Sequence, residues 1–213
     1  MQFTTVFFDL DDTLYAASTG LWPALKERMT RYMVDRMQIP AADVPRLRET
    51  YFRQHGTTLR GLQANHEIDV DDYLAYVHDV RLGEYLQPDA IQQRVLAALR
   101  SRNLIFTNAD ANHARRVLRE LQIEQYFVDI IDVNRMAPYC KPSPQAFALA
   151  LKIAGETDAT RCAMIDDLPH TTRAARDFGM FSVLFGAQEH GGDANAACPD
   201  WSSLPSVLGQ VPA

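Results

Sequence analysis

Two closely spaced acidic residues follow the first apolar run of the chain, in the segment FDLDDT at residues 8–13. Side chains alternate along an extended strand, so Asp9 and Asp11 are expected to point to the same side. Two carboxylates held close together raise each other's pKa, unless a cation compensates or one of them keeps a proton. Both solutions suit phosphoryl transfer. For this segment alone, an acidic turn after a strand is the non-functional alternative.

Polar side chains also follow three later apolar runs. Thr107 and Asn108 come after one run, Lys141 follows another within a proline-rich turn, and Asp166 and Asp167 end a third. Each has an ordinary explanation as a turn residue, a solvated lysine or a helix cap. If the runs are parallel strands, however, their carboxyl ends meet at one edge of a sheet, where ligands bind. Acids, a hydroxyl and a lysine at one edge indicate a site for phosphate and a cation.

The elements that carry these residues alternate between apolar runs and helical spacing. Continuous apolar runs are typical of strands covered by helices on both faces. The alternation predicts an α/β fold with a doubly wound, Rossmann-like parallel sheet. We expect strands at 5–8, 104–106, 128–131, 162–165 and 181–185, and helices at 113–121, 143–154 and 171–178.

The first strand and the second are separated by a long stretch without a strand signal. Apolar residues there recur every three or four positions, including Leu25, Met29 and Met33, which predicts helices. We therefore expect a core domain formed by residues 1–15 and 92–213, and a helical cap formed by residues 16–91. Residues 191–200 are predicted to form a loop, because glycine and small polar residues dominate them.

Composition limits the possible partners. The chain has 213 residues, of which 47% are hydrophobic, and a net charge of −6. This balance fits a globular core and disfavours binding to a nucleic-acid polymer. No run of about 18 apolar residues occurs, so no membrane partner is predicted. The three cysteines form no C-x-x-C pair, and together with the absence of a basic leader they predict a cytoplasmic protein.

The ordered motifs resemble those of the haloacid dehalogenase superfamily of phosphohydrolases, over nearly the whole chain. The similarity is carried by DLDDT at 9–13, TN at 107–108, Lys141 in C-K-P and DD at 166–167. More narrowly, the chain is similar to the pyrimidine 5'-nucleotidase-like branch. The segments that carry this second resemblance are FFDLDDTLY at 7–15, YFRQHGTTLRGL at 51–62, DDYLAYVHD at 71–79 and IFTNAD at 105–110.

The resemblance implies a role for each core motif. Asp9 is the expected nucleophile, which forms an aspartyl-phosphate. Asp11 is the expected acid and base: it protonates the leaving alkoxide and then deprotonates the hydrolytic water. Thr107, Asn108 and Lys141 are the expected phosphate-binding residues, and Thr107 and Lys141 also take part in catalysis.

The same resemblance implies Mg²⁺ as the cofactor. The expected ligands are Asp9, the backbone carbonyl of Asp11 and a carboxylate of the DD motif, with waters completing the octahedron. Asp167 is favoured as the direct ligand, with Asp166 acting through water. The reverse order remains open.

Specificity is expected to come from the cap, because the sheet edge recognises only the phosphate. The candidate substrate-binding residues are Tyr15, His55, Thr58, Arg60 and His78. Their structural alternatives are helix caps, a solvated arginine and core packing. The expected partner is a small phosphate monoester, most closely a pyrimidine nucleoside 5'-monophosphate, bound to a monomer or a homodimer.

Other activities remain open. A sugar-phosphate phosphatase or a phosphomutase would keep the same motifs. A dehalogenase is disfavoured, because a leaving halide needs no acid and Asp11 is present. A phosphate-binding module without activity is the remote alternative, since it predicts the loss of Asp9 or Asp11.

Overall fold

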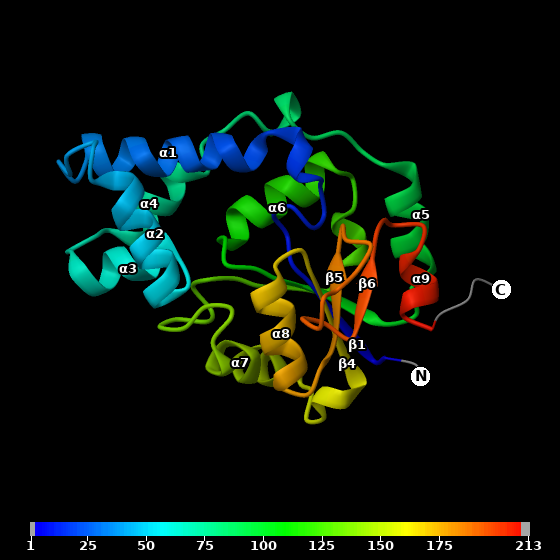
Figure 1. The fold of residues 1–213 in the computed structure, drawn as a ribbon. Coiled ribbons are helices and arrows are strands. Elements are labelled where there is room, and N and C mark those ends of the chain that lie inside the picture. Colours follow the sequence, from blue (N-terminus) through cyan, green and yellow to red (C-terminus); the bar gives the residue numbers. More distant parts are fainter. Residues whose placement is uncertain (1–2, 210–213) are drawn as a thin grey trace.

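A single sheet of six parallel strands forms the centre of the molecule in the computed structural model, which describes residues 3–209 (Figure 1). The strand order is β3-β2-β1-β4-β5-β6. The α/β fold class predicted from the sequence is confirmed. The strands are β1 (Thr5–Phe8), β2 (Arg102–Phe106), β3 (Asp129–Ile131), β4 (Cys162–Asp166), β5 (Phe181–Phe185) and β6 (Ala196–Cys198).

The strand β1 lies in the middle of the sheet, between β2 and β4. All four of its residues are buried, as expected for an apolar run covered on both faces. Phe8 pairs with Ile105 of β2 and with Ile165 of β4. The chain segments that follow these three strands therefore begin at the same sheet edge, which brings their polar side chains together.

Helices cover both faces of the sheet. Val6 and Phe8 pack on one side with α5 (Ala90–Ala98), α6 (Ala111–Glu120) and α9 (Leu204–Val207). Phe7 packs on the other side with α7 (Pro144–Ala154) and α8 (Pro169–Asp177). This division follows the alternation of side chains along β1.

A separate group of helices lies between β1 and α5 in the chain and packs around its own apolar cluster. Tyr32, Met33, Leu62 and Tyr73 belong to that cluster, and Val133 joins it from the sheet domain. Figure 1 shows these helices gathered to one side of the sheet. The boundaries of the cap at residues 16 and 91 stay a prediction. The helices are α1 (Leu21–Asp35), α2 (Val44–His55), α3 (Thr58–Asn65) and α4 (Val70–Val77).

The crossing of α2 and α3 depends on a glycine. A Cβ atom at Gly61 would lie 2.2 Å from the Cβ and Cγ atoms of Tyr51. Any other residue would force the two helices apart, because real Cβ contacts are never that short. Among the described residues, four short 3-10 helices complete the fold: η1 (Ala17–Thr19), η2 (Leu82–Glu84), η3 (Glu124–Tyr126) and η4 (Ala159–Arg161).

Several elements differ from the sequence prediction: β2 begins at Arg102 rather than at residue 104, and α8 begins at Pro169 rather than at residue 171. The segment predicted as a loop at 191–200 contains β6, which pairs with β5 through Val183 and Ala196. The helix predicted at 113–121 is α6, which begins two residues earlier because the Asp110 side chain accepts hydrogen bonds from the backbone N–H groups of Asn112 and His113. Within residues 3–209, no helix is both long and apolar enough to cross a membrane.

Candidate active site

Lys141 lies between two carboxylates at the carboxyl edge of the sheet. Its Nζ atom donates to Asp9 Oδ1 at 2.6 Å and to Asp166 Oδ2 at 2.7 Å. Asp9 follows β1 and Asp166 ends β4, and all three side chains are at least 90% buried. The sequence prediction that these residues share one sheet edge agrees with this geometry.

Thr13 joins the second acid of the DD motif to the same cluster. Its hydroxyl lies 3.2 Å from Asp167 Oδ1 and 3.4 Å from Asp9 Oδ2, and it accepts a hydrogen bond from the Asp167 backbone N–H at 3.1 Å. The sequence contained this residue in the DLDDT motif, yet gave it no separate role. In the structure, the Thr13 hydroxyl contacts both Asp9 and Asp167 and so holds the two residues in a fixed relative position.

Burial makes the carboxylates of this cluster hard to ionise. Desolvation, reinforced by Asp166 and Asp11 and opposed by Lys141, raises the pKa of Asp9 to about 7. Desolvation and the nearby Asp9 charge raise the pKa of Asp167 to about 7. The pKa of Lys141 is raised because Asp166 and Asp9 outweigh its own desolvation. One lysine therefore does not neutralise three buried acids, and a further cation would.

The donor set fits magnesium. One oxygen from each of Asp9, Asp166 and Asp167 lies within 4.8 Å of the others, and magnesium prefers carboxylate oxygens. Asp166 already accepts from Lys141 through Oδ2 and from the Leu168 backbone N–H through Oδ1, at 2.9 Å. Asp167 engages Oδ1 with Thr13. This difference favours Asp167 as the freer metal ligand.

The two residues that follow β2 occupy different environments. Thr107 is 1% exposed, and its hydroxyl accepts a hydrogen bond from the Ala109 N–H at 3.0 Å. The Asn108 amide bonds the Lys141 backbone at both ends, accepting from its N–H at 2.9 Å and donating to its carbonyl at 3.0 Å. Asn108, predicted to bind phosphate, thus holds the segment that carries Lys141.

Asp11 is held by two donors. The Tyr15 hydroxyl donates to Asp11 Oδ1 at 2.6 Å, and His113 Nε2 lies 3.4 Å from the same oxygen. Although burial opposes ionisation, the hydrogen bonds and charge of His113 and the Tyr15 hydroxyl lower the pKa of Asp11. Tyr15, predicted as a substrate-binding residue, uses its hydroxyl within the site. His113 was missed by the sequence analysis, although it follows the TN motif on the next helix.

The loop between α2 and α3 touches the segment that carries Lys141. A Cβ atom at Gly56 would lie 2.8 Å from Cys140 Sγ and 3.1 Å from the Lys141 carbonyl oxygen. Cys140 Sγ donates to the His55 carbonyl at 3.2 Å. His55 and Thr58, both predicted to contact substrate, therefore lie at the two ends of the loop that contacts the Lys141 segment.

Arg60 has a structural environment that the sequence did not reveal. Its guanidinium donates to the carbonyls of Val133 (2.6 Å) and Tyr139 (2.9 Å) and to Gln63 Oε1 (2.7 Å). The side chain is buried, and its Nε, Nη1 and Nη2 atoms all donate within the protein. Arg60 therefore ties α3 to the loop before Lys141, and its role as a substrate ligand stays a prediction.

His78, also predicted to contact substrate, is buried and paired with Asp110. Its Nδ1 lies 2.5 Å from Asp110 Oδ2, and its ring stacks on that of His113 with centroids 4.1 Å apart. Burial lowers the pKa of His78. The pKa of Asp110 falls to about 2, because the bond from His78 and two backbone N–H groups outweigh desolvation.

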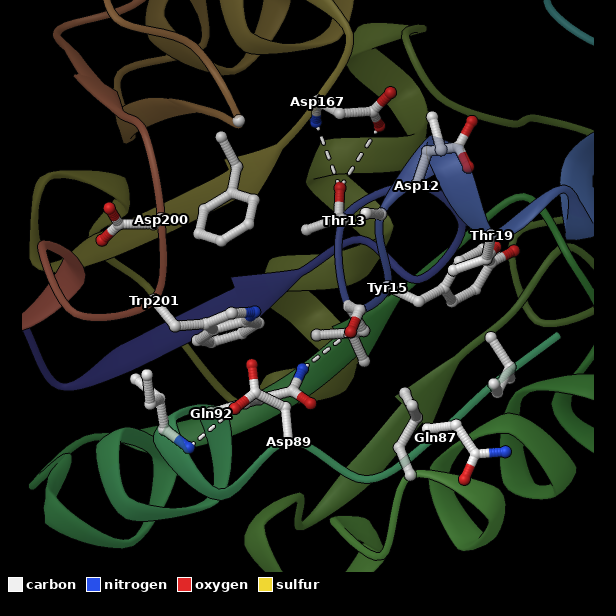
Figure 2. A pocket seen from close by; sticks show the side chains of 18 of the residues that line it. Asp12, Thr13, Tyr15, Thr19, Gln87, Asp89, Gln92, Asp167, Asp200 and Trp201 are labelled. Carbon is white, nitrogen blue, oxygen red and sulfur yellow. Dashed lines mark hydrogen bonds between the residues drawn. The ribbon is translucent and has the colours of Figure 1, made fainter. Parts of the chain in front are cut away.

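A cavity of about 740 Å³ opens beside Thr13 and Asp167. Figure 2 shows Asp12 and Asp167 near one end of it, and Asp89, Asp200 and Trp201 further away. No Lys, Arg or His occurs among the lining residues within 3–209. Because its described lining includes acids but no basic side chains, this cavity disfavours an anionic group.

Comparison with known proteins supplies the family. Residues 3–179 match the family model described as haloacid dehalogenase-like hydrolase. The chain belongs to this family. It is therefore a hydrolase of the haloacid dehalogenase-like type, and the resemblance noted in its motifs is confirmed at that level.

Several haloacid dehalogenase-like relatives are similar in sequence or structure. Phosphate metabolism protein 8 of Saccharomyces cerevisiae is 30% identical over 192 residues, which cover 84% of this chain and 60% of the yeast protein. YfnB of Bacillus subtilis, solved with bound magnesium, gives a TM-score of 0.64 at 15% identity, over 98% of this chain and 100% of the other. The 2-haloacid dehalogenase of Pseudomonas syringae pv. Tomato gives a TM-score of 0.62 at 19% identity, over 98% of this chain and 99% of the other. At these identities the structural matches establish the fold.

Proposed function

We propose that the protein is a magnesium-dependent phosphatase that uses Asp9 as a nucleophile on a small phosphate monoester. The arrangement of Lys141 supports this most directly, since its ammonium bridges Asp9 and Asp166 at 2.6 and 2.7 Å, beside Asp167. A buried cation next to a buried nucleophile suits an anionic substrate. The similarity to a yeast protein named for phosphate metabolism is consistent with the proposal.

The reaction has two halves. In the first, an Asp9 oxygen forms a bond to phosphorus while the bond from phosphorus to the ester oxygen breaks, and Asp11, which must carry a proton at this step despite its lowered pKa, gives that proton to the leaving oxygen. In the second, Asp11 takes a proton from water, whose oxygen attacks phosphorus and releases inorganic phosphate from Asp9. Lys141 and the Thr107 hydroxyl bind the phosphoryl oxygens throughout.

Magnesium, when bound, supplies the positive charge that offsets repulsion between the Asp9 carboxylate and the phosphate. Asp9, Asp167 and the Asp11 backbone carbonyl are the proposed ligands, with Asp166 close by. The raised pKa values of Asp9 and Asp167, both about 7, fit acids that are ionised once a cation is present.

The proposed substrate is a pyrimidine nucleoside 5'-monophosphate, as the motif resemblance implies. The helices between residues 16 and 91 form the proposed cap. Its loop between α2 and α3 contacts the Lys141 segment, which supports the proposal that His55 lies close to the leaving group. A roofed site of this kind suits a small ester. Sugar phosphates remain the alternative class.

The test is phosphate release from a panel of nucleoside monophosphates and sugar phosphates, with magnesium or with a chelator. We expect magnesium-dependent release that Asp9→Asn abolishes, whereas Asp71→Asn, an exposed acid on α4, leaves it unchanged. Release from sugar phosphates alone would keep the chemistry and reject the nucleotide. Turnover of a 2-haloacid without release from any phosphate ester would reject the phosphatase.

A further inference from the structure

Asp11 is held at one oxygen from two directions. Tyr15, four residues further along the same loop, donates its hydroxyl to Oδ1 at 2.6 Å. His113 Nε2, on the first turn of α6, lies 3.4 Å from that oxygen. The Asp11 side chain is 19% exposed. With Oδ1 engaged by two neighbours, Oδ2 is the oxygen left to exchange a proton with a bound molecule.

The surroundings of His113 indicate which of its two ring nitrogens carries the proton. The side chain is 0% exposed, and its Nδ1 is buried without a hydrogen-bond partner within residues 3–209. An unpaired buried N–H costs more than a bare lone pair, so Nε2, which faces Asp11, is the nitrogen better placed to carry a proton. His113 is therefore a donor to Asp11.

The ring of His113 is itself held in place through the chain that leaves α4. Its centroid lies 4.1 Å from that of His78, and the two rings are inclined by 15°. His78 Nδ1 bonds Asp110 Oδ2 at 2.5 Å, and Asp110 Oδ1 accepts from the backbone N–H groups of Asn112 and His113 at 2.8 and 3.0 Å. A series of direct contacts therefore connects His78, at the end of α4, through His113 to Asp11.

The same stretch of chain is anchored to α6 a second time. Arg116 Nη1 donates to the His78 carbonyl at 2.8 Å, and Nη2 donates to the Val80 carbonyl at 2.6 Å. Residues 78–80 lead from α4 back toward the sheet domain. Because α6 carries both His113 and Arg116, one rigid helix fixes this return segment and the donor to Asp11.

We infer that Tyr15 and His113 are positioning residues that turn Asp11 Oδ2 toward the ester oxygen of the substrate, with the His78–Asp110 pair fixing His113. The inference rests on the proposed function and goes beyond it, because neither the motifs nor the family model assigns His113 or Asp110. The competing explanation is a buried polar network that stabilises the fold and has no effect on proton transfer.

Leaving-group dependence separates these explanations. An alkyl ester such as a nucleoside monophosphate needs a proton on its leaving oxygen, whereas p-nitrophenyl phosphate releases a stable phenolate without one. We would measure kcat/KM for both, since this ratio reports only the steps up to formation of the phosphorylated Asp9. Tyr15→Phe and His113→Leu should lower kcat/KM for the alkyl ester by about 10-fold or more, and by less than about 2-fold for the aryl ester.

Matched variants control for folding. His113→Gln retains an amide donor near the position of Nε2 and should recover most of the alkyl-ester activity. Tyr32→Phe removes another part-buried tyrosine-to-carboxylate bond, the 3.0 Å contact with Asp72 in the helical group, and should leave kcat/KM unchanged for both esters. If His113→Leu does not fold, Tyr15→Phe and His113→Gln still decide the question.

Equal losses on the two esters, or no loss on the alkyl ester, would overturn the positioning role while leaving the phosphatase intact. Asp11→Asn provides the upper limit for the selective loss. A wild-type protein that releases phosphate from neither ester would reject the proposed function, and this inference with it. The two failures are therefore distinguishable.

Discussion

Magnesium is expected to stabilise the protein strongly at about pH 8 and far less at about pH 5.5. Asp9 and Asp167 have pKa values raised from 3.8 to about 7. A carboxyl group whose folded pKa is raised contributes stability that is present at low pH and is lost as the pH rises toward 7. A cation that binds the ionised carboxylates restores stability at high pH, where no proton has to leave.

The size of the effect follows from the same values. At about pH 5.5 each bound proton costs about 2 kcal/mol to remove, so two cost about 4 kcal/mol of binding free energy. At about pH 8, magnesium at about 100 times its dissociation constant adds about 2.7 kcal/mol. For a chain of this length, that corresponds to a rise in Tm of about 5–10 °C.

The rise in Tm caused by magnesium is measured by thermal unfolding at both pH values, with magnesium or with a chelator. Asp167→Asn removes the freer ligand and should abolish most of the shift, whereas Asp71→Asn, an exposed acid on α4, should keep it. The reasoning fails if the shift is the same at both pH values, or if Asp167→Asn shows the full shift.

Three further variants test the packing and the charges. Lys141→Met should lower the free energy of unfolding at neutral pH by about 3–5 kcal/mol, because it leaves two buried carboxylates unpaired. Urea unfolding measures this loss of free energy, and Lys152→Met, at an exposed lysine, is the control. A loss below about 1 kcal/mol in Lys141→Met would contradict the prediction. Gly61→Ala should cost about 1–3 kcal/mol and lower Tm, since its Cβ would meet Tyr51 at 2.2 Å; an unchanged Tm would contradict the α2–α3 crossing. Asp110→Asn should cost about 2 kcal/mol near pH 6, because the folded pKa of Asp110 is lowered to about 2 and its stabilisation exists above the unfolded value of 3.8. Urea unfolding near pH 2.5 should show that difference reduced to about a third, because the stabilisation is lost as the pH falls toward the folded pKa, and a constant difference would refute the assignment.

The sheet was predictable because its strands are buried on both faces. The runs at 5–8 and 162–165 are continuous and apolar, and they correspond closely to β1 and β4. The strand β6 gave no such signal, since it has only three residues, Ala196–Cys198, two of them half-buried. Short edge strands are defined by the neighbour with which they pair, which a local pattern does not contain.

The site was predictable in its acids and its lysine, and less so in its hydrogen bonds. Strand ends at one sheet edge bring Asp9, Lys141 and Asp166 together whatever the details of the loops. The partners of Arg60 and His113 depend instead on how distant segments pack. Arg60 donates to carbonyls more than 70 residues away, and His113 meets an acid about 100 residues earlier. Residue type and spacing give no access to such pairings.

The central position of β1 has a consequence for biosynthesis. This strand leaves the ribosome before β2 and β4, yet Thr5 pairs with Arg102 on one side and with Cys162 on the other. During translation it has no sheet neighbour until β2 has emerged, and no second neighbour until β4 has emerged. Such distant pairings slow folding and leave an apolar segment exposed for most of synthesis. The nascent chain therefore gains its complete acidic cluster only when Asp166 and Asp167 arrive, so a ribosome-bound fragment that stops earlier lacks part of the group Asp9, Asp166 and Asp167.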